Sequence, residues 1–150
     1  MRRVFSSARM AHWLVLLLVI LSTSLLLTAC EEEKEATLKN VELAHGYSQG
    51  EAVDPSTTYK TTDKSIHTVI QMGGKSPSGA KLKVNWLAVD TADGARNKSL
   101  QQKEVIVSVD NLFYDFVLNA PEGSGFATGK YQADVSINGT VEKTLYFTVQ

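Results

Sequence analysis

Only one cysteine, Cys30, occurs among the 150 residues. No disulfide can form within the chain, so its fold must be stable without the cross-links common in small secreted domains. Histidine is also scarce, and outside the N-terminal leader only His45 and His67 remain. Neither has a second histidine two or four residues away, which is the spacing of many zinc sites. We therefore expect no metal and no other cofactor.

The N-terminus has the composition of an export signal. Arg2, Arg3 and Arg9 precede an almost unbroken apolar stretch from 13 to 27, which is the usual order of a basic and a hydrophobic region. The stretch ends in Leu27-Thr28-Ala29-Cys30, which resembles the lipobox of bacterial lipoproteins. A plain membrane-spanning anchor is the alternative, because the stretch approaches the length that a helix needs to cross a bilayer.

The lipoprotein resemblance implies that the leader is cleaved and that Cys30 carries lipid as the new N-terminus. More than one acyl chain gives stable anchoring, where a single chain does not. We expect a signal peptide over 1–29 containing a hydrophobic helix, an acidic tether over 30–36 and one folded domain over 37–150. The resemblance places the domain on the periplasmic face, with the outer membrane favoured over the inner. A short twin-arginine-like start offers a second export route to the same side.

The charge balance bears on partners. Without the three leader arginines, 12 basic residues face 16 acidic ones, a net charge of −4. A mildly acidic domain is a poor match for nucleic acid or anionic lipid surfaces, so we expect neither as the main partner. The run Glu31 to Glu35, four glutamates and one lysine, accounts for −3 of that net charge. Such a run is typical of a solvated tether.

From Ala36 onward the dominant hydrophobic period is two, which predicts strands and no amphipathic helix. The series that share one predicted face are Ile66/Thr68/Ile70/Met72, Leu82/Val84/Trp86/Ala88, Val105/Val107/Val109, Leu112/Tyr114/Phe116/Leu118, Tyr131/Ala133/Val135/Ile137 and Leu145/Phe147/Val149. Turn signals separate them, including Gly73-Gly74, Asp93-Gly94 and Asn138-Gly139. We expect one antiparallel β-sandwich of about seven strands, with 46–64 as a long connection or a poor edge strand.

The last hairpin poses a register problem. A two-residue turn at Asn138-Gly139 would pair Tyr131 with Tyr146 and turn the final apolar series away from the core. We predict one extra residue, in the loop or as a bulge near Glu142-Lys143, so that Tyr131 faces Phe147 and Ala133 faces Leu145.

From residue 66 to the end, the chain resembles bacterial immunoglobulin-like or fibronectin-III-like domains. The features are Trp86 on the third strand, the loop 121–125, Gly129-Lys130-Tyr131, Ile137-Asn138-Gly139 and a final Phe147-Thr148-Val149. Antibody cysteines are absent, which excludes that subfamily. The resemblance implies architecture and not activity.

Catalytic motifs are not evident in the sequence. Ser124 lies in Glu-Gly-Ser-Gly and not in a G-x-S-x-G elbow. Gly73-Gly74-Lys75-Ser76 lacks phosphate-loop spacing and is better explained as a hairpin turn, and Asp93-Gly94 is a turn without the ligands of a calcium loop. We place His67 on a strand face and His45 in a loop. No nucleophile, base and orienting group can be assembled from adjacent motifs, so we expect no enzyme.

Two functions follow from this pattern. In the first, a lipid-anchored immunoglobulin-like domain acts in the cell envelope through protein contacts, as an adaptor, assembly accessory or inhibitor. Its surface would consist of Leu87, Val89, Phe113 and Val117, apolar residues opposite the predicted core that would converge on one sheet. The alternative is a small-ligand or carbohydrate-binding module that stacks its ligand on Trp86, Tyr47, Tyr59 or Phe126.

Overall fold

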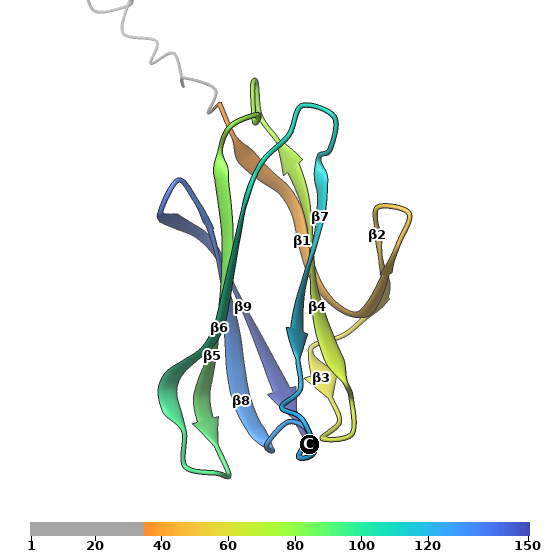
Figure 1. Cartoon of the computed structure of the whole chain (residues 1–150), viewed down its shortest axis with the longest axis vertical. Helices are drawn as coiled ribbons and strands as arrows, with labels where there is room; N and C mark the ends of the chain where they lie inside the picture. Colours follow the sequence, from red (N-terminus) through yellow and green to blue (C-terminus); the bar gives the residue numbers. More distant parts are fainter. Residues whose placement is uncertain (1–34) are drawn as a thin grey trace, which may run out of the picture. The chain divides into compact units, whose positions relative to one another are not determined.

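The computed structural model describes residues 35–150, and the leader, the lipobox and Cys30 lie outside this range. Nine strands form two sheets (Figure 1), and no helix within the described part could cross a membrane. The strands are β1 Thr37–Ser48, β2 Glu51–Pro55, β3 Thr58–Tyr59, β4 Ser65–Gly73, β5 Lys81–Thr91, β6 Arg96–Ile106, β7 Phe113–Asn119, β8 Gly129–Ile137 and β9 Thr140–Val149. The predicted all-β sandwich is confirmed.

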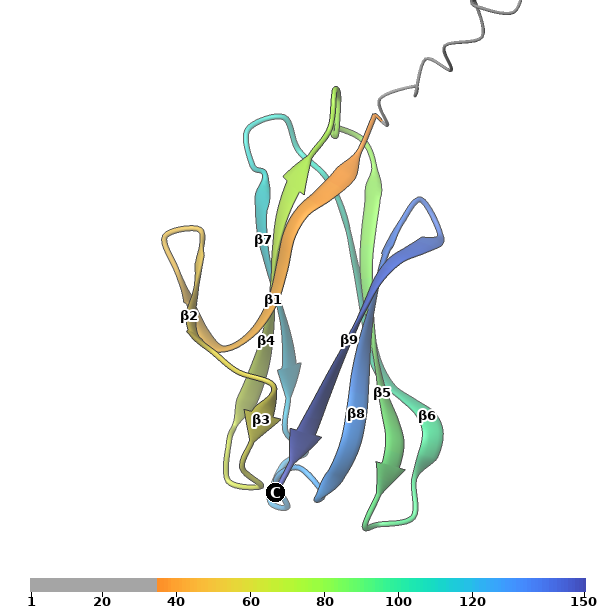
Figure 2. The same ribbon diagram turned by 180° about the vertical axis from the view of Figure 1, so that it is seen from behind.

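The two sheets pack face to face, as the reverse view also shows (Figure 2). One has the order β2-β1-β4-β7 and the other the order β3-β9-β8-β5-β6. All pairs are antiparallel except the short β3, which lies parallel to β9. At one side of the sandwich both sheets end in a free edge strand, β6 in one and β7 in the other. This open edge positions the site described below.

The core lies between the sheets and follows the predicted alternation. The four inward residues of β4, the four of β5 and the four of β8 are all buried. Trp86 of β5 is fully buried, and its indole Nε1 donates a hydrogen bond of 3.1 Å to Oγ1 of Thr68 on β4. The indole N–H is thus satisfied without water, as a buried donor requires.

A tyrosine at the start of β8 fixes the loop before it. The Tyr131 hydroxyl donates to the carbonyl oxygen of Ala127, four residues upstream, at 2.5 Å. This tyrosine corner and a buried tryptophan on β5 are both marks of immunoglobulin-type sandwiches. The second cysteine of an antibody domain would stand two residues after the tyrosine, where this chain has the buried Ala133.

The predicted register of the last hairpin is confirmed. Tyr131 pairs with Phe147 and Ala133 with Leu145. Thr140 follows a tight turn at Asn138-Gly139, and the register shifts where Ser136 faces Val141 while Val135 faces Lys143. The extra residue is therefore a bulge at Glu142, which keeps the apolar side chains of β9 directed to the core.

The segment 46–64 agrees with the second of the two alternatives, because it contains an edge strand, β2, which is followed by the short β3. Several other sequence-based predictions are wrong in detail. Gly73-Gly74 is no hairpin turn, because β4 and β5 belong to different sheets and the segment crosses between them. Val109 does not share a face with Val107: β6 ends at Ile106, and Val109 is 72% exposed in the following connection. His45 lies within β1 and not in a loop.

Candidate functional site

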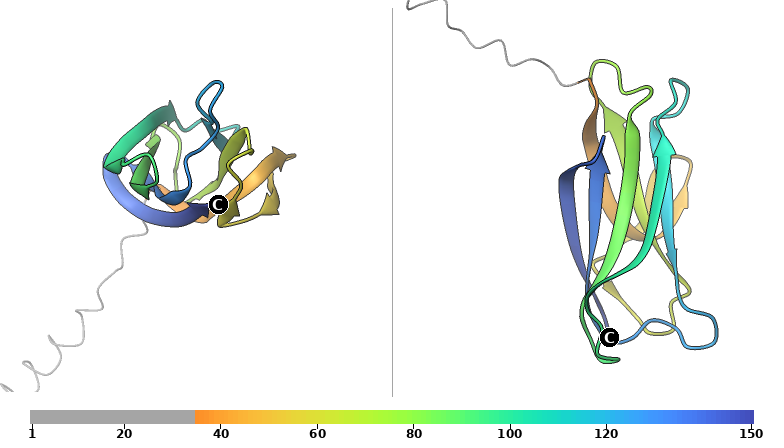
Figure 3. Two further views of the ribbon diagram at one scale, coloured as in Figure 1. Left: turned by 90° about the horizontal axis from the view of Figure 1, so that it is seen from below. Right: turned by 60° about the vertical axis from the view of Figure 1, so that its left-hand side comes forward.

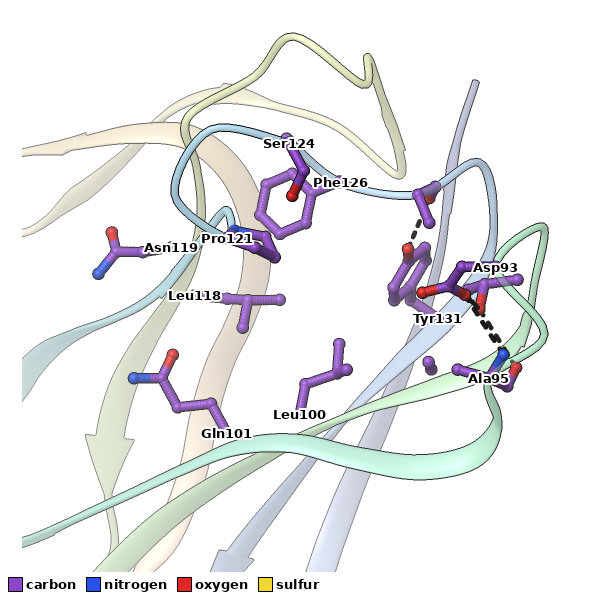
Figure 4. Close-up of a pocket in the computed structure, with 14 residues that line it drawn as sticks. Asp93, Ala95, Leu100, Gln101, Leu118, Asn119, Pro121, Ser124, Phe126 and Tyr131 are labelled. Atoms are coloured by element: carbon purple, nitrogen blue, oxygen red, sulfur yellow. Dashed lines mark hydrogen bonds between the residues drawn. The ribbon is translucent and has the colours of Figure 1, made fainter.

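A pocket opens at the edge between β6 and β7 (Figure 4). The segments that surround it lie at the end of the sandwich opposite the start of β1 (Figure 3). The volume of the pocket is about 510 Å³. Four chain segments surround it: the β5–β6 hairpin, the end of β7, the loop 120–128 and the first residues of β8. Pockets of this size that are concave and mostly apolar are common ligand sites.

Apolar side chains form the pocket floor and one wall. Leu118 and Phe126 are almost fully buried and close the pocket toward the core. Leu100 of β6 lies at the rim and is 42% exposed, although it is a large aliphatic residue. Pro121 completes the apolar surface from the loop. An apolar side chain from a ligand could thus be buried here without moving the core.

A small number of polar groups stand among these apolar walls. Asp93 accepts hydrogen bonds from Oγ1 of Thr91 at 2.5 Å and from the backbone N–H of Ala95 at 3.3 Å. The bond from Thr91 and then that from Ala95 hold the pKa of Asp93 below its usual value, so the rim carries a fixed negative charge. The side chains of Gln101 and Ser124 add an amide and a hydroxyl group, whereas the amide of Asn119 points away from Leu118 and Phe126 (Figure 4).

Tyr131 also lines the pocket, but its hydroxyl is engaged with Ala127. Burial, assisted by the negative charge of Asp93, raises the pKa of this phenol. The ring therefore stays neutral and serves as an apolar wall at physiological pH.

A lysine bridges the open edge beside the pocket. The Lys103 Nζ atom of β6 donates a hydrogen bond of 2.7 Å to the backbone carbonyl oxygen of Val117 on β7. Strand edges that carry unpaired backbone groups can add a foreign strand, and lysine is a common protection against this. Beyond that bond, both edges run along the pocket without a further strand in the part of the chain that the structure describes.

The predicted partner surface is not brought together. Leu87 and Val89 lie on β5 of the five-stranded sheet, whereas Phe113 and Val117 lie on β7 of the four-stranded sheet. The expectation that they converge on one sheet is wrong, because the alternation of each strand shows which side chains avoid the core and not which sheet a strand joins. None of the four lines the large pocket.

The aromatic residues proposed as stacking platforms are mostly inside. Trp86, Tyr59 and Phe126 are buried, and only Tyr47 is half-buried. A different ring, Phe113, is 37% exposed and lines a cleft of about 370 Å³ with Glu42, Glu51 and Gln71 among others. The β1–β2 turn closes this cleft: a Cβ atom on Gly50, at φ +89°, would lie 3.4 Å from the Phe113 ring.

Both histidines of the described range contact carboxylates. His67 lies on a strand face as predicted and contacts Asp115 at 2.9 Å. His45 Nδ1 lies 3.7 Å from Asp63, and its ring lies 4.7 Å from that of Tyr59. Burial, with the negative charges of Asp63 and Asp54, raises the pKa of Tyr59. Within residues 35–150 no three His, Cys, Asp or Glu side chains are grouped to hold a metal ion.

The residues of the large pocket could not be found from the sequence, because they come from four segments whose association depends on sheet topology. The loop after β7 was recognised only as a turn. Leu100 offered one usable signal, as an aliphatic residue in an otherwise polar stretch from Arg96 to Glu104.

Comparison with known proteins gives a fold and no family. No family model matches the sequence, and no curated protein matches it. Among solved structures, an immunoglobulin-like protein from Pseudomonas aeruginosa is similar over 79% of this chain and 99% of its own length, with a TM-score of 0.55 and 16% identity. The alkylpurine DNA glycosylase AlkC from Pseudomonas fluorescens, solved bound to DNA, matches with a TM-score of 0.48 and 8% identity, over 77% of this chain and 30% of its own. The first likeness, together with the tyrosine corner and the buried tryptophan, shows that residues 35–150 fold as an immunoglobulin-like β-sandwich.

Proposed function

We propose that this protein is a lipid-anchored, periplasm-facing binding domain that holds an extended segment of a partner protein at the open edge between β6 and β7. The observation that carries this proposal is the pocket of about 510 Å³ beside an unpaired strand edge. A segment that adds to β6 would gain backbone hydrogen bonds from the edge, while a pocket beside the strand selects one of its side chains.

The chemistry of the edge indicates the kind of segment. Beside the apolar pocket, β6 exposes the side chains of Arg96 and Lys98, and only one acidic residue, Glu104, lies on the strand. Arg96 is already paired with Asp90 at 3.4 Å, and Asp93 places a negative charge on the pocket rim. A segment with one apolar side chain for the pocket, an acidic residue near Lys98 and no acidic residue beside Asp93 would therefore be complementary to this edge. Electrostatic complementarity of this kind mainly sets orientation and association rate.

Attachment at Cys30 would present the site away from the membrane. The folded domain starts at the end of the sandwich opposite the pocket, so a tether entering there leaves the pocket end free. The support for the anchor itself is the leader followed by Leu27-Thr28-Ala29-Cys30. Replacement of Cys30 by alanine should release the protein from membranes, and mass spectrometry of the mature N-terminus should find diacylglyceryl-cysteine in the unmodified protein.

Site-specific photo-crosslinking tests the binding edge. A photoreactive amino acid at Leu100, at the pocket rim, should capture a segment of one partner in the native envelope. The matched control carries the photoreactive amino acid at position 106 instead. Ile106 is 57% exposed on the same strand but does not line the pocket. A peptide with the captured sequence should then bind the purified protein, and Leu100→Glu should weaken binding at least about tenfold by removing the apolar contact. Equal capture at both positions, or a peptide insensitive to Leu100→Glu, would contradict the proposal.

The Phe113 cleft favours a second candidate, a small-ligand or carbohydrate site. An exposed aromatic face beside carboxylate and amide groups can stack on a sugar and hydrogen-bond its hydroxyls. Phe113→Ala should then abolish binding of a glycan found by array screening, while Tyr146→Ala, at an exposed ring that does not line this cleft, should not. Retained binding in Phe113→Ala would eliminate this candidate.

A further inference from the structure

A serine, a histidine and an aspartate form a continuous hydrogen-bonded chain on the outer face of the four-stranded sheet. Ser65 Oγ lies 3.3 Å from Nε2 of His67, and Nδ1 of His67 lies 2.9 and 3.0 Å from the two carboxylate oxygens of Asp115. The side chains of His67 and Asp115 are each 18% exposed. The group shares no residue with the large pocket.

The strand geometry explains why these three meet. Ser65 and His67 are two residues apart on β4, so they point to the same face, opposite the buried Ile66 and Thr68. His67 pairs with Val117 of β7, and Asp115 stands two residues along the same strand, on the same face. Diagonal neighbours across two strands are within reach of long side chains.

The order of contacts is that of an activated serine. A carboxylate that accepts the Nδ1–H bond of a histidine fixes the tautomer in which Nε2 carries the free electron pair. That Nε2 atom faces the Ser65 hydroxyl and can accept its proton. A nucleophile, a base within reach of it and a third group that orients the base are the elements of nucleophilic catalysis, and apo structures commonly show somewhat long distances.

We propose that Ser65 is an acyl-accepting nucleophile, with His67 as its base and Asp115 as the positioning residue, and that the group hydrolyses small esters. Ser65 Oγ would form a bond to the ester carbonyl carbon while its proton passes to Nε2 of His67. The bond from that carbon to the alcohol oxygen then breaks, and the departing alcohol takes the proton from Nε2. A water molecule next attacks the acyl carbon, gives a proton to Nε2, and releases the acid as Ser65 recovers that proton.

The surroundings suit a small polar substrate. His67 is flanked in the sheet by Ala44, which is fully buried, and by Val117, so its ring is shielded from most water. Ser65 pairs with Asn119 at the end of the sheet. Lys64, directly before β4, and Ala120, directly after β7, line a neighbouring pocket of about 420 Å³ formed with Thr61, Thr62 and the loop 121–125. The substrate class is therefore a short ester with a polar alcohol or acid part.

A serine-reactive fluorophosphonate probe tests this on the full chain in detergent. Mass spectrometry should locate the label on Ser65, and Ser65→Ala should remove it. His67→Ala should slow labelling by at least about 100-fold, since general-base catalysis contributes about 10²–10⁴. Added imidazole should restore part of the rate, which a merely structural histidine would not allow. Asp115→Asn should slow labelling and Asp115→Glu should restore part of it.

The controls separate chemistry from folding. Ser99, an exposed serine whose hydroxyl donates to Asn85 at 2.7 Å, should not be labelled, and Ser99→Ala should leave the rate at Ser65 unchanged. Hydrolysis of p-nitrophenyl acetate should be lost in Ser65→Ala. If His67→Ala does not fold, judged by circular dichroism, His67→Gln replaces it. Labelling of Ser65 no faster than that of Ser99, or a rate unaffected by both His67 variants, would show a structural hydrogen-bond network only and overturn the proposal.

Discussion

The buried bond between Trp86 and Thr68 allows the sharpest test of what stabilises this sandwich. Thr68→Val keeps the shape of the side chain and removes only the hydroxyl that accepts from the indole N–H at 3.1 Å. Both residues are fully buried, so water cannot replace the lost partner. A buried donor left without a partner costs about 1–3 kcal/mol, and no cavity contribution is expected because valine and threonine have nearly the same volume.

The measurement is urea denaturation of the purified protein, followed by far-ultraviolet circular dichroism. The unfolding free energy should fall by about 1–3 kcal/mol with an unchanged slope, and the melting temperature should fall by about 4 °C for each kcal/mol. In Trp86→Phe the indole N–H is absent, so adding Thr68→Val to that variant should cost much less. A loss below about 0.5 kcal/mol in Thr68→Val alone, or equal losses in both backgrounds, would refute the reasoning.

Three further predictions concern the loop, the edge and the turns. Because burial raises the pKa of Tyr131, the neutral phenol contributes to the unfolding free energy below its unfolded pKa of about 10, and this contribution is lost as the pH rises further. Tyr131→Phe should therefore flatten the alkaline fall of the unfolding free energy, measured by urea titrations from pH 8 to 11. The same variant should lower stability at neutral pH by about 1 kcal/mol, because the hydroxyl hydrogen bond is lost. Lys103→Met should accelerate hydrogen exchange in β7, because the bond to the Val117 carbonyl is removed, and unchanged exchange would show that the lysine does not hold the edge. Gly129→Ala should destabilise the protein by several kcal/mol more than Gly94→Ala in calorimetry, since both glycines have positive φ but only a Cβ atom on Gly129 collides with backbone of β5.

The long strands could be predicted because local pattern and global packing agree in them. The inward series of β4, β5 and β8 alternate without interruption, and each proved buried. The extra residue in the last hairpin also followed from the sequence, since the turn at Asn138-Gly139 and the apolar series of β9 cannot both be satisfied without it. The sequence left open whether this residue lies in the loop or in a bulge near Glu142-Lys143.

The elements that were missed depend on pairing between distant segments. β3 has only two residues and exists because Thr58 and Tyr59 lie beside Thr148 and Val149, far along the chain. β2 is short and mostly exposed, so no alternation of buried residues marked it, and the segment 46–64 was predicted only as a long connection or a poor edge strand. Periodicity carries no information about such pairings.

The candidate sites were hidden for the same reason. Asp115 reaches His67 across 48 positions of sequence, and motif reading compares only residues close in the chain. The large pocket likewise depends on β6 and β7 ending two separate sheets at the same side of the sandwich. Sequence could show which side chains turn away from the core, but not which sheet each strand would join.

The lysine that spans the open edge makes the two edge strands, β6 and β7, unequal as sites for adding a foreign strand. A foreign strand laid along β7 must first detach the ammonium group of Lys103 from the carbonyl of Val117, and that cost is subtracted from any affinity gained there. The backbone of β6 contributes no atom to this bond. A foreign strand can therefore pair with β6 while the hydrogen bond between Lys103 and Val117 remains in place and the spacing between the sheets is kept.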